Sequence, residues 1–96
     1  MFFPSNIKLL PFSRFAVCDR SMEPAILDGD HVLTFNWIKP KVKDVIVFQS
    51  GKIYKIKRVI KTSKGLIFVA GDNKEFSTKE KPVKKRDVVG KVIAKY

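Results

Sequence analysis

Apolar residues recur along this chain in short runs rich in Val, Ile and Phe, and polar or turn-forming residues separate the runs. The breaks fall where Pro, Gly, Ser, Asn and Asp gather, as at Lys39-Pro40 and Gly71-Asp72-Asn73. Short runs with this punctuation are typical of β-strands joined by turns. The pattern predicts strands at 14–18, 31–36, 44–49, 52–61, 66–70 and 87–95.

The same pattern argues against helices. No long stretch repeats its apolar residues with a period of 3.6, so we expect at most one short helical turn, after Ser21 and entering at Pro24. Ser50-Gly51 and Ser63-Lys64-Gly65 predict hairpin turns. The polar segment 77–87 predicts a loop. The chain should therefore fold as an all-β protein, a small coiled sheet or partial barrel.

A chain of 96 residues, 45% of them hydrophobic and eight of them Phe, predicts one folded domain over 1–96 with one core. Residues 1–13 are apolar but interrupted by Pro4 and Pro11, and we interpret them as a cap on the core, with contact to a bilayer surface as the alternative. No run approaches the roughly 18 apolar residues of a spanning helix, and no export signal is evident. We expect a cytoplasmic protein, with peripheral membrane contact through the N-terminus left open.

The chain carries 20 Lys and Arg against nine Asp and Glu, a formal net charge of +11. Such a charge raises nucleic acid and anionic lipid as partners. The basic residues stand one or two at a time between apolar ones, which favours the solvated face of strands. A small basic β-barrel that binds nucleic acid through lysines and aromatic stacking remains an alternative, although we do not favour a nucleic acid partner.

Two residues that suggest other chemistry have simpler interpretations. The single cysteine, Cys18, excludes an internal disulfide and a cysteine-rich zinc site, and we expect it in the core. His31 follows Asp30, but neighbouring strand residues point to opposite faces, so the two cannot align on one serine. We expect His31 on the surface of a strand. No metal or cofactor is predicted.

The stretch "DRSMEPAILDGDHVLTFN" places Ser21 and Pro24 in a turn between two apolar segments. Taken alone, Ser21 is most simply a turn or helix cap. Further pieces follow in order: "SMEP" at 21–24, "DGD" at 28–30, "YKIKRVI" at 54–60, "GDNKEFS" at 71–77 and "VVGKV" at 88–92. Together they resemble the type I signal peptidase family, in the superfamily that also contains LexA-like peptidases.

This resemblance implies a serine endopeptidase in which Ser21 is the nucleophile and Lys57 the general base. It further implies a peptide or precursor-protein substrate, a leader or signal-like peptide cut after small residues, with Met22 and Pro24 in contact with it. A lysine base needs apolar surroundings that lower its pKa from about 10.4. We therefore expect Lys57 to be buried beside Ser21, although strand alternation puts it with Lys55 on a partly solvated face.

The oxyanion of such a reaction needs hydrogen-bond donors, and the backbone amide of Ser21 is one by construction. Two residues before the nucleophile, where some relatives offer a hydroxyl, stands Asp19, an acceptor of the wrong charge. Either Asp19 points away or another amide serves. By resemblance, Ser77 is a candidate to hydrogen-bond and orient Lys57.

Other positions depart from the family or have a structural interpretation. Lys79 and Lys81 stand where the family has an aspartate and an arginine, so that supporting ion pair is absent. The segment 71–73 has the composition of a turn, and we interpret it as structural. An inactive peptidase-like scaffold thus remains an alternative. A LexA-type repressor that cuts its own chain is disfavoured, because no DNA-binding module precedes Ser21 and no Ala-Gly cleavage segment is present.

Overall fold

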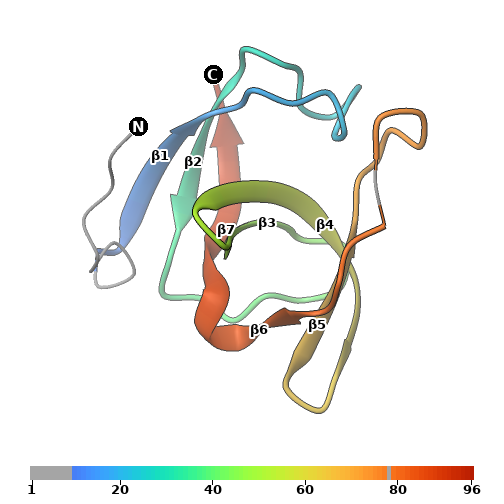
Figure 1. The fold of residues 1–96 in the computed structure, drawn as a ribbon. Helices are drawn as coiled ribbons and strands as arrows, with labels where there is room; N and C mark the ends of the chain where they lie inside the picture. The colour runs from blue at the N-terminus through green and yellow to red at the C-terminus, as the bar shows by residue number, and fades with distance from the viewer. Residues whose placement is uncertain (1–9, 78) are drawn as a thin grey trace.

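The computed structural model describes residues 10–77 and 79–96, which form one antiparallel β-sheet (Figure 1). Its strands lie in the spatial order β1-β2-β7-β3-β4-β5-β6, so the C-terminal strand is inserted between β2 and β3. The elements are β1 (Phe12–Ala16), β2 (His31–Phe35), β3 (Val45–Ser50), β4 (Ile53–Ser63), β5 (Leu66–Ala70), β6 (Val83–Lys84), the 3₁₀ helix η2 (Lys85–Asp87) and β7 (Val88–Lys95).

The predicted all-β fold is confirmed, and each predicted strand exists, the strand at 66–70 with the predicted ends and the others with one or both ends shifted. One segment differs from expectation. The segment predicted as a loop at 77–87 contains β6 and η2, because Val83 is buried and pairs with Ile67 of β5. After Ser21 the chain forms hydrogen-bonded turns, consistent with at most one short helical turn there, and the amide of Ile26 donates to the carbonyl of Met22 at 2.9 Å.

The sheet coils, so that its middle is buried on both faces. Pairing shifts by one residue between Leu33 and Thr34 of β2 and between Val59 and Lys61 of β4, and such bulges increase the local twist. One core cluster comprises Phe15, Val17, Met22, Ile26, Val32, Val47, Ile56 and Val89; a second comprises Ile46, Phe48, Val59, Ile67, Val69 and Val83. Consecutive residues of β3 thus enter different clusters.

The loop at 18–28 is anchored at both of its ends. The amide of Val17 donates to the carbonyl of Asp30, and the amide of Gly29 donates to the carbonyl of Val17, both at 2.8 Å. Gly29 has φ +93°, a conformation that glycine adopts without strain. The pairing of β1 with β2 is therefore closed beyond the strand ends, which fixes the place from which the loop carrying Ser21 departs.

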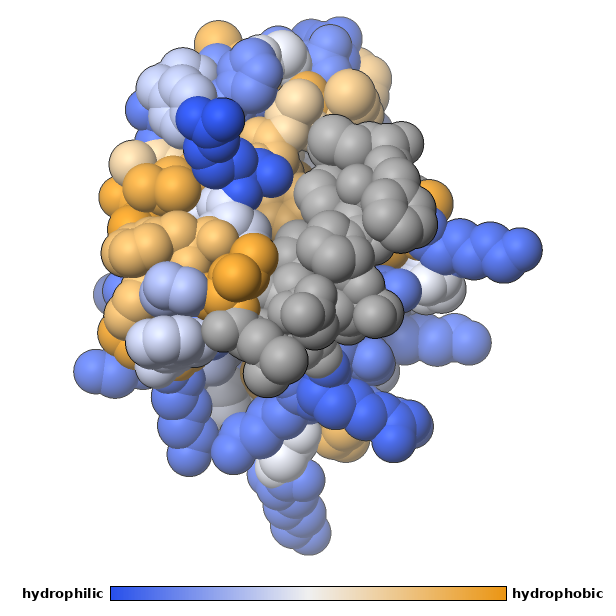
Figure 2. All heavy atoms as spheres, turned by 90° about the vertical axis from the view of Figure 1, so that its left-hand side faces the viewer, coloured by the Kyte–Doolittle hydropathy of each residue, from blue (hydrophilic) through white to orange (hydrophobic). Residues whose placement is uncertain are grey.

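The cap or membrane contact predicted for 1–13 lies outside the described residues as far as residue 9. Leu10 and Phe12 are exposed, and the side-chain amide of Asn36 donates to the carbonyl of Leu10 at 3.0 Å. Within residues 10–77 and 79–96, no helix has the length and apolar character needed to cross a membrane. Hydrophilic side chains project from the lower part of the face in Figure 2, as expected for lysines on solvated strand faces.

Candidate active site

Ser21 lies on the loop after β1, with its side chain fully buried. Met22 anchors this loop, because its side chain is enclosed in the first core cluster. On the other side, the carbonyl of Ser21 accepts a hydrogen bond from the amide of Asn73 at 2.7 Å. The backbone of the serine is thus held between the core and the loop that follows β5.

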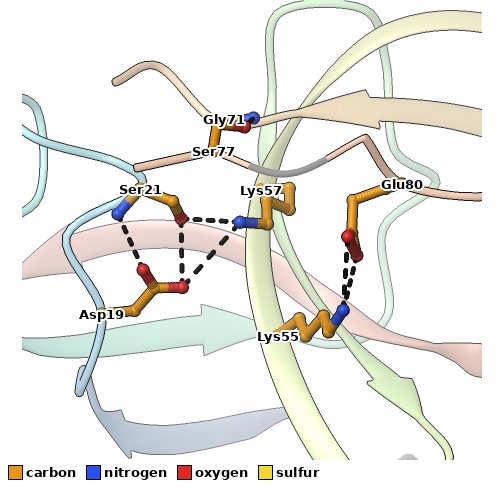
Figure 3. A network of polar contacts seen from close by, with 7 residues as sticks. All are labelled: Asp19, Ser21, Lys55, Lys57, Gly71, Ser77 and Glu80. Carbon is orange, nitrogen blue, oxygen red and sulfur yellow. Dashed lines mark hydrogen bonds and ion pairs between the residues drawn. The ribbon is translucent and has the colours of Figure 1, made fainter. Parts of the chain in front are cut away.

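Lys57 reaches Ser21 from the middle of β4. Its Nζ lies 2.7 Å from Oγ of Ser21, and the residue is only 4% exposed (Figure 3). Among the described lysines it is the only one that is buried. The partly solvated face suggested by strand alternation is wrong for this position, since Ile56 and Lys57 are consecutive and both buried in the coiled sheet.

Lys55, the other lysine that alternation offered, points to a different partner. Its Nζ lies 2.8 Å from a carboxylate oxygen of Glu80, away from the serine (Figure 3). The amino group of Lys55 is therefore engaged with a carboxylate and makes no contact with the serine. The geometry therefore separates the two lysines, and only Lys57 is placed to exchange a proton with Ser21.

Asp19 does not point away from Ser21. Its Oδ1 accepts a hydrogen bond from the amide of Ser21 at 2.7 Å, and its Oδ2 accepts one from Oγ of Ser21 at 3.1 Å. Oδ2 also lies 3.8 Å from Nζ of Lys57, so the carboxylate of Asp19, the hydroxyl of Ser21 and the amino group of Lys57 each lie close to the other two (Figure 3). The amide that the sequence offers for an oxyanion is occupied by this carboxylate.

The segment 71–73 packs directly against the serine, which sequence reasoning missed when it treated these residues as a turn alone. A Cβ at Gly71 would lie 2.7 Å from the carbonyl oxygen of Ser21 and 2.7 Å from Oγ of Ser77, so only glycine fits. Ser77 itself accepts a hydrogen bond from the amide of Gly71 at 3.1 Å. No hydrogen bond joins Ser77 to Lys57 in the described part of the chain, and its orienting role stays a prediction.

An ion pair that the sequence did not indicate ties this loop to β4. Arg58 donates from Nε and Nη2 to the two carboxylate oxygens of Asp72, both at 2.8 Å, and from Nη1 to the carbonyl of Lys43 at 2.7 Å. The hydrogen bond to Asp72 raises the pKa of the Arg58 guanidinium above its usual value, although burial opposes the shift. The pair lies next to Lys57 in β4, on the strand edge where pairing with β5 begins.

A groove of about 520 Å³ reaches the serine–lysine pair at Lys57, which lines it, whereas the buried Ser21 does not. One side of the groove is formed by the end of β1 and the loop that follows it. The other side is formed by residues 52–57, which include the first part of β4. Its walls are mainly apolar, and Asp19 and Lys57 line it as well. Apolar side chains in the lining include Phe15, Val17, Val47, Tyr54, Ile56 and Phe76.

Several predicted positions lie elsewhere than expected. Met22 is enclosed in the core and Pro24 is exposed, and neither lines this groove. Cys18 is exposed and lines the groove, so its predicted place in the core is wrong: alternation turns Val17 inward and Cys18 outward. His31 is exposed at the start of β2 and stacks on Tyr96, as expected for a surface residue.

The described residues contain no group of three or more His, Cys, Asp or Glu that could hold a metal ion. A search of curated proteins found no match to this chain. The family model described as Peptidase S24-like matches residues 14–93 and so includes the loop of Ser21, the strand of Lys57 and most of β7. That match leaves the signal-peptidase subtype a prediction. Because this family model covers more than half of the chain, the chain belongs to the Peptidase S24-like family, in the superfamily that LexA-like and signal peptidases share.

Proposed function

We propose that this protein is a serine endopeptidase in which Ser21 is the nucleophile and Lys57 the general base. The observation that carries the proposal is the 2.7 Å separation between Nζ of Lys57 and Oγ of Ser21, with both residues buried. A serine hydroxyl is a weak nucleophile unless a base accepts its proton. Membership of a peptidase-type family supports the same reaction.

In the proposed reaction, Oγ of Ser21 attacks the scissile carbonyl carbon while neutral Lys57 accepts the hydroxyl proton. The ammonium of Lys57 then donates that proton to the leaving amine, and the C–N bond breaks. Water, deprotonated by the same lysine, attacks the acyl-enzyme and releases Ser21. Burial supports this cycle, because it keeps bulk water away from the contact between Ser21 and Lys57, so that the proton passes directly between the two side chains.

The groove supports an extended peptide as the substrate. β1 is an edge strand of the sheet, and pairing between β4 and β5 begins only at Arg58, beyond the part of β4 that lines the groove. A peptide lying along such strands is held by main-chain hydrogen bonds, and pockets read its alternate side chains. From the resemblance to signal peptidases, we propose a leader or signal-like peptide with small residues before the cleaved bond.

Mass spectrometry of a peptide pool tests this function, with half of the pool carrying small residues at alternate positions. We expect wild type to cleave after small residues, and Ser21→Ala and Lys57→Met to lose at least about a thousandfold in rate. Lys55→Met should keep turnover, because its ammonium is bound to Glu80. Lys61→Met is the matched control, since Lys61 lies in the same strand and is exposed.

The intact mass of the protein, read in the same samples, tests whether it cuts its own chain as LexA-like relatives do. Cleavage that survives Ser21→Ala would reject the proposed dyad. If wild type cleaves nothing but binds nucleic acid with a steep salt dependence that Ser21→Ala leaves unchanged, the basic β-barrel alternative is favoured.

A further inference from the structure

We propose that Asp19 closes the oxyanion site of the free protein and that the substrate carbonyl must displace its carboxylate before Ser21 can react. This inference rests on the proposed peptidase function. It concerns a residue that is two positions before the nucleophile and touches both groups that the reaction uses, the amide and the hydroxyl of Ser21.

The backbone amide of Ser21 is already occupied in the free protein. In the proposed reaction the negative charge develops on the carbonyl oxygen of the substrate, and the amide of Ser21 is the donor that the nucleophile itself supplies. That amide already donates to Oδ1 of Asp19 at 2.7 Å. A carboxylate at the same place also repels a developing oxyanion. The carboxylate and the oxyanion therefore exclude one another.

The hydroxyl proton of Ser21 points towards Asp19 and not towards Lys57. A hydroxyl has one proton, and Oγ of Ser21 donates it to Oδ2 of Asp19 at 3.1 Å while accepting a hydrogen bond from Nζ of Lys57 at 2.7 Å. General-base catalysis needs the reverse, with the proton of Oγ directed at the lone pair of the lysine nitrogen. The arrangement is thus that of a resting dyad, which departure of Asp19 would release.

The side chain of Asp19 is able to move away from Ser21. Its side chain is 41% exposed and lines the groove, whereas Ser21 and Lys57 are buried. Its carboxylate is bound to Ser21 and faces Lys57, so rotation towards solvent exchanges these contacts for water. A peptide that enters the groove brings a carbonyl to the same amide. Substrate binding and opening of the site are then one event.

The test compares wild type with Asp19→Gly and Asp19→Asn on the best peptide from the pool. Loss of a hydrogen bond to a charged group corresponds to a gain in kcat/KM of about ten- to a hundredfold for Asp19→Gly. Asp19→Asn should gain less, because its side-chain oxygen still accepts from the Ser21 amide. Asp28→Asn is the charge-matched control, since Asp28 is exposed and does not line the groove, and it should keep the wild-type rate.

A second readout does not depend on activity. The amide proton of Ser21 should resonate downfield in wild type, as expected for a bond to a carboxylate, and move upfield in Asp19→Gly but not in Asp28→Asn. An unchanged resonance would overturn the contact. A folded Asp19→Gly that cleaves no faster than active wild type would overturn the closing role while leaving the peptidase function intact. Inactivity of wild type and both Asp19 variants alike would instead reject the peptidase function, and the closing role with it.

Discussion

Arg58 and Asp72 form a two-pronged ion pair, in which Nε and Nη2 each lie 2.8 Å from a different carboxylate oxygen. Arg58 is adjacent to Lys57 in β4, and Asp72 belongs to the loop whose next residue, Asn73, bonds to the carbonyl of Ser21. One contact therefore couples the strand that carries the proposed base to the loop that holds the proposed nucleophile.

We expect Arg58→Lys to lower the free energy of unfolding by about 1 kcal/mol, because an ammonium cannot reproduce two parallel hydrogen bonds and the pair is partly exposed. The rate of peptide cleavage should fall as well, since the strand that carries Lys57 is then held less firmly to the loop that bonds to Ser21. Denaturant unfolding and kcat/KM measure the two effects. Arg86→Lys, at an exposed position of η2, is the control. Equal stability of wild type and Arg58→Lys would show that the second hydrogen bond of the pair contributes nothing.

The pH dependence of this pair has a definite sign. The pKa of Arg58 is raised in the folded state, so the stabilisation from its charge is present below the usual arginine range and is lost only as pH rises through the higher folded value. The stability difference between wild type and Arg58→Met should therefore stay constant between neutral and mildly alkaline pH. A decline in that range, measured by denaturant unfolding, would contradict the assignment.

The strand pattern could be predicted because alternation and turn residues are local signals. β6 could not, since Val83–Lys84 is too short to show a period, and only its pairing with β5 makes it a strand. The apolar run that ends at Cys18 predicts a core position for it, although its neighbour Val17 is the residue that points inward. Periodicity fixes which residues share a face, but a slip of one residue exchanges the two faces.

The site was only partly accessible to the same reasoning. Alternation assumes one wet face per strand, and the coiled sheet buries both faces of β4 at Ile56 and Lys57, so the motif order rather than the period indicated Lys57. No local signal could show that Asp19 turns its carboxylate onto the amide of Ser21, because that geometry depends on the path of the loop between Val17 and Gly29.

Lys57→Met should leave the protein as stable as wild type or stabilise it by about 1 kcal/mol, even though it abolishes the proposed activity. Methionine replaces a buried amino group with an apolar chain of similar length. No polar group is left without a partner, because Oγ of Ser21 still donates to Asp19 and the Asp19 side chain is 41% exposed. Denaturant unfolding measures this effect. Lys57→Ala, which leaves a cavity, should instead lower the free energy of unfolding by about 2 kcal/mol. Equal losses in both variants would argue that the amino group of Lys57 itself stabilises the fold.

Gly71→Ala should lower both stability and activity. The added Cβ would lie 2.7 Å from the carbonyl oxygen of Ser21, and that oxygen is held in place by the amide of Asn73. Overpacking of this kind costs about 1–3 kcal/mol, or displaces the nucleophile. Thermal unfolding and cleavage rate separate the two outcomes. Adding Ser77→Ala removes only the clash with Oγ of Ser77 and leaves its Cβ at 3.0 Å, so it should recover only part of the loss. Full recovery would mean that Oγ of Ser77, and not the carbonyl of Ser21, limits the space.

Cys18 offers a direct test of the groove, because it is the only cysteine of the chain and its exposed side chain lines that groove. A bulky maleimide coupled to Cys18 should block peptide cleavage in proportion to the labelled fraction, whereas methylthiolation, which adds a small group, should block it far less. Cys18→Ser treated with the same maleimide is the control and should keep its activity. A bound peptide should also slow the labelling of wild type, since it covers the thiol. Fully labelled protein that cleaves at the wild-type rate would place the substrate outside this groove, and with it the proposed path of the peptide to Ser21.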